Sequence, residues 1–293
     1  MKKKKYIAPN EASAGRWIAA LLISLAVGSV LGLPFADFLD DTENFVMGIP
    51  YADFFGLLTF VFLFWALVLA IRFVGKTSLK DFILGVGGFV DGKLCLRILG
   101  LYALGFAIPY LLTLGNLRVQ TVDWGQFGFL LLFISLVAWT QTTWEELLYR
   151  GLFLRWACKN KIGYTKRVPV AAVISSLAFA ISHAANPEVT SQFGIYTVIA
   201  VISYAVPGFM LFLADLHFGN LLPGILIHWL NNFLLFTLLS SEVRAVSVPT
   251  LLIDTTDGGA IWSLVSNTLA YLPLLIYILW DRKKRKKAVS TEE

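Results

Sequence analysis

Three short groups of ionisable and polar residues interrupt apolar stretches in the second half of this 293-residue chain. The groups are Trp144-Glu145-Glu146-Leu147-Leu148-Tyr149-Arg150, then Phe179-Ala180-Ile181-Ser182-His183, then His228-Trp229-Leu230-Asn231-Asn232. An ionisable side chain inside a membrane costs roughly 2.5–3.5 kcal/mol on insertion scales, so several in one chain indicate a function. Carboxylates and imidazoles are also the groups that most often carry protons in catalysis.

The spacing of the first group predicts different roles for its two glutamates. Residues four apart share a helix face, whereas adjacent residues point about 100° apart. Glu146 and Arg150 can therefore pair with each other, and Glu145 is left without a partner in its own helix. A carboxylate that has lost its water shell is a stronger base than one in solution, so Glu145 is the candidate general base.

The third group repeats the four-residue spacing with two hydrogen-bond donors. His228 and Asn232 lie on one helix face and can donate to a single oxygen, as stabilisation of an oxyanion requires. Each group also has a plainer interpretation. The glutamates could form an interfacial charged turn, His183 could lie at a membrane interface, and His228 could only join two helices. His217, in a short polar loop, is expected at the surface.

The composition indicates that the helices carrying these residues span a membrane. Hydrophobic residues make up 57% of the chain, charged residues 15%, and the mean hydropathy is +0.73. A helix crosses the hydrocarbon core with about 20 apolar residues. The sequence therefore predicts an all-α polytopic membrane protein, one domain over 1–293, with about eight spans around a buried polar cavity. The expected spans are 17–35, 54–74, 94–114, 126–148, 168–185, 194–214, 219–239 and 261–280.

The distribution of charge predicts orientation rather than nucleic-acid binding, although the formal net charge is +5. Lysine and arginine gather before the first span, after the second and fourth, and after the last. The positive-inside rule then places both termini in the cytoplasm. The segment 75–93 could be an amphipathic interfacial helix or a connecting loop. Two cysteines, Cys95 and Cys158, indicate neither a disulfide framework nor a cysteine-rich metal site.

The ordered set Glu-Glu-x-x-x-Arg, Phe-x-x-x-His and His-x-x-x-Asn resembles the CAAX-protease and bacteriocin-processing family of intramembrane endopeptidases. The resemblance covers roughly 140–235, within an expected motif-bearing core of about 126–239. Asn186-Pro187 after His183 is also similar to the family's second motif.

The resemblance implies hydrolysis of a peptide bond in a membrane-associated substrate, including lipidated or bacteriocin-like peptides. By it, Glu145 and His183 would activate a water, and His228 and Asn232 would stabilise the oxyanion. Supporting roles would fall to Glu146, Arg150, Phe179 and Asn186.

No metal or other cofactor is expected, although two histidines and a glutamate also suit zinc. The chain has no His-Glu-x-x-His helix, and Asn232 is a better hydrogen-bond donor than zinc ligand, so the metal-free mechanism is favoured. A proton-coupled transporter and a non-catalytic immunity or scaffold protein are the alternative functions.

The expected spans leave one conflict about depth. If the fourth span ended at Arg150 on the cytoplasmic side, Glu145 and His183 would lie near opposite faces of the bilayer. Residues 151–158 are apolar enough to continue the helix. We therefore expect a fourth span nearer 134–157, with Glu145 at mid-depth and the helix before His183 tilted, broken or displaced.

Overall fold

The computed structural model describes residues 14–85, 88–158, 164–256 and 259–290. Its elements are almost all helices. The long helices are α1 (Ala14–Gly32), α2 (Tyr51–Phe73), α4 (Gly92–Leu112), α5 (Trp124–Glu146), α7 (Tyr164–Ser182), α9 (Ile195–Phe218), α10 (Leu222–Thr237) and α11 (Gly259–Ser290). The shorter ones are η1 (Leu33–Phe38), α3 (Leu79–Leu84), η2 (Leu114–Asn116), η3 (Leu147–Gly151), α6 (Leu152–Cys158) and α8 (Pro187–Thr190).

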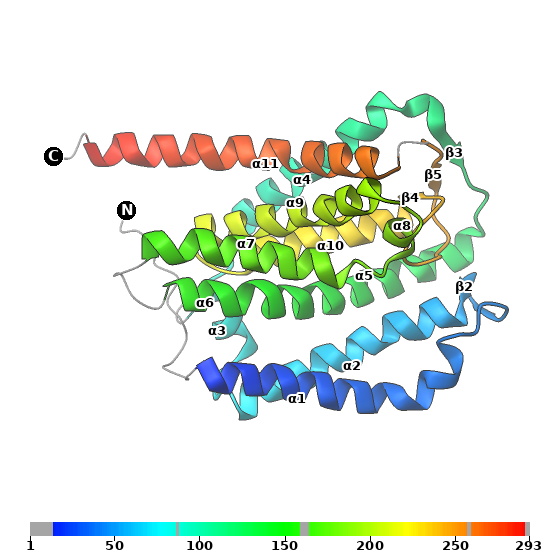
Figure 1. Cartoon of the computed structure of the whole chain (residues 1–293), viewed down its shortest axis with the longest axis horizontal. Coiled ribbons are helices and arrows are strands. Elements are labelled where there is room, and N and C mark those ends of the chain that lie inside the picture. The colour runs from blue at the N-terminus through cyan, green and yellow to red at the C-terminus, as the bar shows by residue number, and fades with distance from the viewer. Residues whose placement is uncertain (1–13, 86–87, 159–163, 257–258, 291–293) are drawn as a thin grey trace.

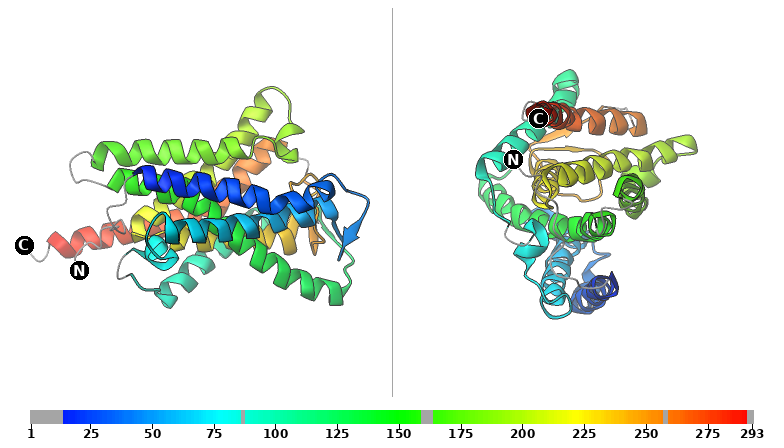
Figure 2. Two further views of the ribbon diagram at one scale, coloured as in Figure 1. Left: turned by 90° about the horizontal axis from the view of Figure 1, so that it is seen from below. Right: turned by 90° about the vertical axis from the view of Figure 1, so that its left-hand side faces the viewer.

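The long helices form one bundle with its strands gathered at one end (Figure 1). Seen end-on, α1 and α2 form one side and α4 and α11 the other, with α5, α7, α9 and α10 between them (Figure 2). Helix α1 begins and α11 ends at the same end of the bundle (Figure 1). The strands are β1 (Phe45–Val46), β2 (Ile49–Pro50), β3 (Leu117–Val119), β4 (Leu239–Ser241) and β5 (Leu252–Asp254). In the larger sheet β5 lies between β3, to which it is antiparallel, and β4, to which it is parallel.

The all-α polytopic architecture predicted from the sequence is confirmed, and a long helix covers most of each expected span. The count of eight is not confirmed, because six helices in the described part of the chain are long and apolar enough to cross a membrane. Helices α7 and α10 are not among the six, and α10 has only 16 residues. These two helices carry the histidine motifs.

Close helix packing depends on glycine at one crossing. A Cβ on Gly105 would lie 2.0 Å from the carbonyl oxygen of Ala270 and 3.0 Å from Cδ of Pro273. Only glycine therefore lets α4 approach α11 this closely. The contact holds α4 and α11 together on one side of the bundle.

The helix that carries the glutamates does not stop at Arg150. Helix α5 continues through the π-helical turn η3 into α6, so one helix runs over 124–158. A π turn breaks the regular pattern of backbone hydrogen bonds, and here the Ser175 hydroxyl donates to the Tyr149 carbonyl (2.8 Å). The expectation that the helix extends past Arg150 is confirmed, and Glu145 lies well inside the bundle.

In the described parts of the segment 75–93, which are 75–85 and 88–93, the helix that precedes α4 is short. Helix α3 covers only Leu79–Leu84, and the Ser78 hydroxyl caps it by accepting a hydrogen bond from the Asp81 N–H (3.0 Å). Phe82 and Ile83 are buried against the bundle. The Leu221 N–H donates to the Ile83 carbonyl (2.9 Å), which ties α3 to the start of α10.

The prediction that His217 is a surface residue is wrong. Its side chain is 4% exposed, and its Nε2 lies 2.9 Å from Oδ2 of Asp281. The reason is the length of α11, which continues to Ser290 rather than ending near 280. Asp281, just past the expected end of the span, therefore contacts His217 at the end of α9.

Candidate active site

His228 lies between the two adjacent glutamates in the centre of the bundle. Its Nδ1 is 2.8 Å from Oε1 of Glu146, and its Nε2 is 3.6 Å from Oε2 of Glu145. All three side chains are buried. Because a carboxylate oxygen accepts, Nδ1 of His228 carries the hydrogen of the shorter contact. The other nitrogen then faces Glu145 at a distance too long for a direct hydrogen bond.

Arg150 closes the other side of this group. Its Nη1 is 3.1 Å from Oε1 of Glu146, which is the pairing that the four-residue spacing predicted. The guanidinium also lies over the Phe179 ring, 4.3 Å from the ring centre. Both members of the ion pair are fully buried. A buried charge is tolerated when it is paired, and each of these two side chains supplies the partner of the other.

Phe179 lies between the two histidines. Its ring centre is 4.5 Å from that of His183 and 5.5 Å from that of His228. The main-chain carbonyl of Phe179 lies 2.7 Å from Nδ1 of His183. No hydrogen bond joins His183 to Glu145 among the residues that the structure describes. His183 is thus a neighbour of the Glu145–His228 pair across an aromatic ring, and not a direct partner of Glu145.

Asn232 lies one helical turn after His228 and is already partly engaged. Its Oδ1 accepts a hydrogen bond from Nδ2 of Asn231 (3.0 Å), whose own Oδ1 accepts from the Tyr102 hydroxyl (2.6 Å). An amide whose oxygen is used in this way presents its NH2 group as the donor. The orientation of Asn232 therefore suits donation, and it is fixed by α4 as well as by α10.

Asn186 lies in the loop after His183 and belongs to a second polar group. Its Nδ2 donates to the Tyr204 hydroxyl (3.1 Å) and to Oε1 of Glu188 (3.2 Å). The Tyr204 hydroxyl also donates to Oε1 of Glu188. This group contacts the site through the Tyr204 ring, which stacks on His183.

Two residues near the glutamates were missed by the sequence reasoning. Gln141 lies one turn before Glu145 and donates to its Oε1 (3.1 Å). Asp215 on α9 is fully buried, accepts from the Gly224 N–H (2.7 Å) and interacts electrostatically with Glu146 and Arg150. The four-residue spacing before Glu145 could have pointed to Gln141. Asp215 had no such signal, because its neighbours come from other helices.

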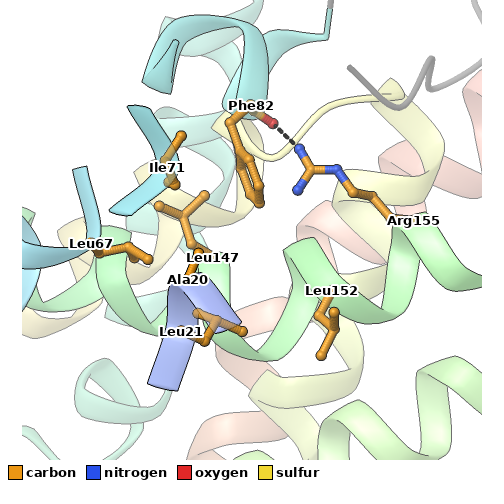
Figure 3. Close-up of a pocket in the computed structure, with 8 residues that line it drawn as sticks. All are labelled: Ala20, Leu21, Leu67, Ile71, Phe82, Leu147, Leu152 and Arg155. Carbon is orange, nitrogen blue, oxygen red and sulfur yellow. Dashed lines mark hydrogen bonds between the residues drawn. The ribbon is translucent and has the colours of Figure 1, made fainter. Parts of the chain in front are cut away.

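A small hollow lies near the cluster but does not contain it. It is lined by Ala20, Leu21, Leu67, Ile71, Phe82, Leu147, Leu152 and Arg155 (Figure 3). Nη2 of Arg155 donates to the Phe82 carbonyl (3.1 Å). None of the predicted site residues lines this hollow, which lies between α1, α2 and α3 on one side and η3 and α6 on the other.

Zinc was the alternative that the sequence left open for these residues. Among the described residues, no group of three or more histidine, cysteine, aspartate or glutamate side chains could hold a metal ion. His183, which a zinc site would need, has its Nδ1 at the Phe179 carbonyl and its ring against Tyr204. The described contacts around Glu145 and Glu146 are hydrogen bonds and ion pairs.

Comparison with known proteins identifies the segment that holds these residues. Residues 126–234 match the family model described as type II CAAX prenyl endopeptidase Rce1-like. The match includes every predicted site residue and agrees with the resemblance seen in the three motifs. No curated protein matches the chain.

Proposed function

Residues 126–234 carry the sequence of a membrane-protease family, and from that premise we propose that Glu145, His183, His228 and Asn232 catalyse peptide-bond hydrolysis. The observation that carries the proposal is the contact of His228 with both glutamates inside the bundle. A buried carboxylate with one oxygen free of hydrogen bonds is a suitable base for a water molecule. Glu145 has such an oxygen, Oε2, and this atom faces His228.

In the proposed reaction, Glu145 takes one proton from a water held at Oε2. The resulting hydroxide attacks the carbonyl carbon of the substrate and forms a tetrahedral oxyanion. Glu145 then gives its proton to the amide nitrogen as the C–N bond breaks, so that an acid and an amine leave. Nε2 of His183 is the free nitrogen of its ring, and it can accept a hydrogen bond that orients the attacking water.

We assign stabilisation of the oxyanion to His228 and Asn232. The role requires the doubly protonated ring, and the carboxyl groups of Glu145 and Glu146 lie on its two sides. In that form the ring donates through Nδ1 to Glu146 and presents Nε2–H to the oxyanion. Asn232 supplies the second donor from the same face of α10. Fixed donors of this kind contribute about 3–4 kcal/mol each to transition-state stabilisation.

The family suggests a peptide substrate that lies in the membrane. Within that class we propose a segment next to a lipidated cysteine, because a lipid anchor would bring the peptide to a site inside the bundle. The proposed reaction uses no metal. The protein is an integral membrane protein, and we propose that both termini face the cytoplasm, where the positive-inside rule puts the basic ends.

The proposal is tested with the full chain reconstituted in liposomes. The probe is a fluorescence-quenched peptide with a prenylated cysteine three residues before its C-terminus, compared with the same peptide without lipid. We expect Glu145→Gln to lower the rate by about 100-fold or more. Glu242→Gln, which changes an exposed glutamate paired with Arg118, is the matched control and should keep the wild-type rate.

Undiminished cleavage by Glu145→Gln would remove the assigned role of that carboxylate. Absence of cleavage by the wild type, together with proton flux that depends on an added solute, would favour a transporter instead.

A further inference from the structure

His183 has one ring nitrogen committed to the backbone. The Phe179 carbonyl lies 2.7 Å from Nδ1, and the Ser182 hydroxyl lies 3.2 Å from the same atom. A carbonyl oxygen only accepts, so Nδ1 carries the hydrogen and Nε2 has the lone pair in the neutral ring. This is the form that a base or acceptor needs. The imidazole must stay in this orientation, although His183 lies just after the last residue of α7.

Two aromatic rings hold the imidazole in place. The Tyr204 ring stacks on it with centres 4.5 Å apart and planes at 22°, and the Phe179 ring touches it at 4.5 Å with planes at 46°. Phe179 is on α7 itself, one turn before His183. Tyr204 comes from α9, so it is the contact that relates the imidazole to a second helix.

Tyr204 is fixed in turn by the loop that follows His183. Its hydroxyl accepts from Nδ2 of Asn186, the N-cap of α8, and donates to Oε1 of Glu188 in the first turn of α8. The Tyr204 ring therefore lies beside His183, and its position depends on the side chains of Asn186 and Glu188.

We propose that Tyr204 is a positioning residue for His183, anchored by Asn186 and Glu188. It holds the imidazole so that Nδ1–H reaches the Phe179 carbonyl and Nε2 remains open toward the site. The inference deepens the proposed function and rests on it for the catalytic use of His183. The orientation of the ring can be measured without any activity.

Three variants of the full chain test the proposal. Tyr204→Leu removes the ring, and Tyr204→Phe keeps the ring but removes the anchored hydroxyl. Tyr196→Leu removes an exposed tyrosine from the same helix and serves as the control. We expect Tyr204→Leu to lower kcat about 100-fold with little change in KM, because a misplaced group costs about that much. Tyr204→Phe should fall between Tyr204→Leu and the wild type.

Nitrogen NMR of 15N-histidine-labelled protein in micelles gives the second measurement, with the His183 signal assigned by its loss in His183→Gln. The wild type should show the form protonated at Nδ1, and Tyr204→Leu should show a mixture of the two ring forms. A Tyr204→Leu variant with the kcat and the His183 spectrum of Tyr196→Leu would overturn the proposal. If the wild type cleaves no peptide but the His183 spectrum still changes in Tyr204→Leu, the protease function alone is refuted and the positioning role stands.

Discussion

The ion pair between Glu146 and Arg150 makes a quantitative prediction about the stability of the bundle. Both side chains are fully buried, and Nη1 of Arg150 lies 3.1 Å from Oε1 of Glu146. Removing one partner of a buried pair leaves an uncompensated charge and costs about 3–5 kcal/mol. Glu146→Gln keeps the size of the side chain but leaves the buried guanidinium without the carboxylate that pairs with it. We expect this variant to lose about 3–5 kcal/mol of unfolding free energy.

The matching change, Arg150→Met, should cost a similar amount, because Glu146 would keep only its hydrogen bond from His228. The double variant contains neither charge. We therefore expect its loss to be smaller than the sum of the two single losses by about 2–3 kcal/mol. Unfolding in mixed detergent micelles, followed by tryptophan fluorescence, measures all four proteins of this cycle.

Activity should behave differently from stability in the same cycle. We expect Glu146→Gln to lower the cleavage rate, because it removes the carboxylate at Nδ1 of His228. The double variant regains stability but also lacks this carboxylate, so its cleavage rate should stay equally low. Two results would refute the reasoning. Additive losses of free energy would show that the pair is not coupled, and a recovered cleavage rate would show that Glu146 does not act through His228.

Three further predictions concern the surroundings of the site. Asp215→Asn keeps the acceptor for the Gly224 N–H and the size of a fully buried side chain, so the pH–rate profile should stay in place. Asp215→Leu leaves that N–H without its acceptor and should lower the unfolding free energy by about 1–3 kcal/mol. Gly105→Ala should lower the unfolding free energy by about 1–3 kcal/mol through overpacking, whereas Gly100→Ala, with open space around it, should not. Excess chelator should leave the cleavage rate of the purified protein unchanged, and loss of activity restored by zinc would contradict the metal-free mechanism.

The membrane fold could be predicted because composition and periodicity act along a single helix. A run of about 20 apolar residues predicts a membrane-spanning helix, because the bilayer is the solvent around such a helix. The count of spans could not be fixed in the same way, because α10 is short and packs among α4, α5 and α9, while α7 has Lys166 and Arg167 near its start. Such helices can be shorter or more polar than a helix that faces lipid on all sides.

The pairing of Glu146 with Arg150 was also predictable, since both residues lie on one helix and spacing alone brings them together. The contact of His228 with both glutamates required the packing of α10 against α5. The motifs suggested that these helices meet, but they did not indicate which imidazole would be nearer to Glu145. The structure places His228 there, with Phe179 between it and His183.

The π turn connects these local and tertiary features. Five residues, Leu147–Gly151, form a wider turn directly after the glutamates, and the Tyr149 carbonyl that it releases accepts from Ser175 of α7. The same turn carries Arg150 to Glu146 and onto Phe179, which also belongs to α7. In a regular α-helix each residue is rotated by about 100° about the axis from the one before. The wider π turn changes this rotation for the residues that follow the glutamates. The irregular turn thus positions α5 and α7 against each other at the point where the first two motifs meet. Neither hydropathy nor spacing reveals it, because it depends on a hydroxyl from another helix.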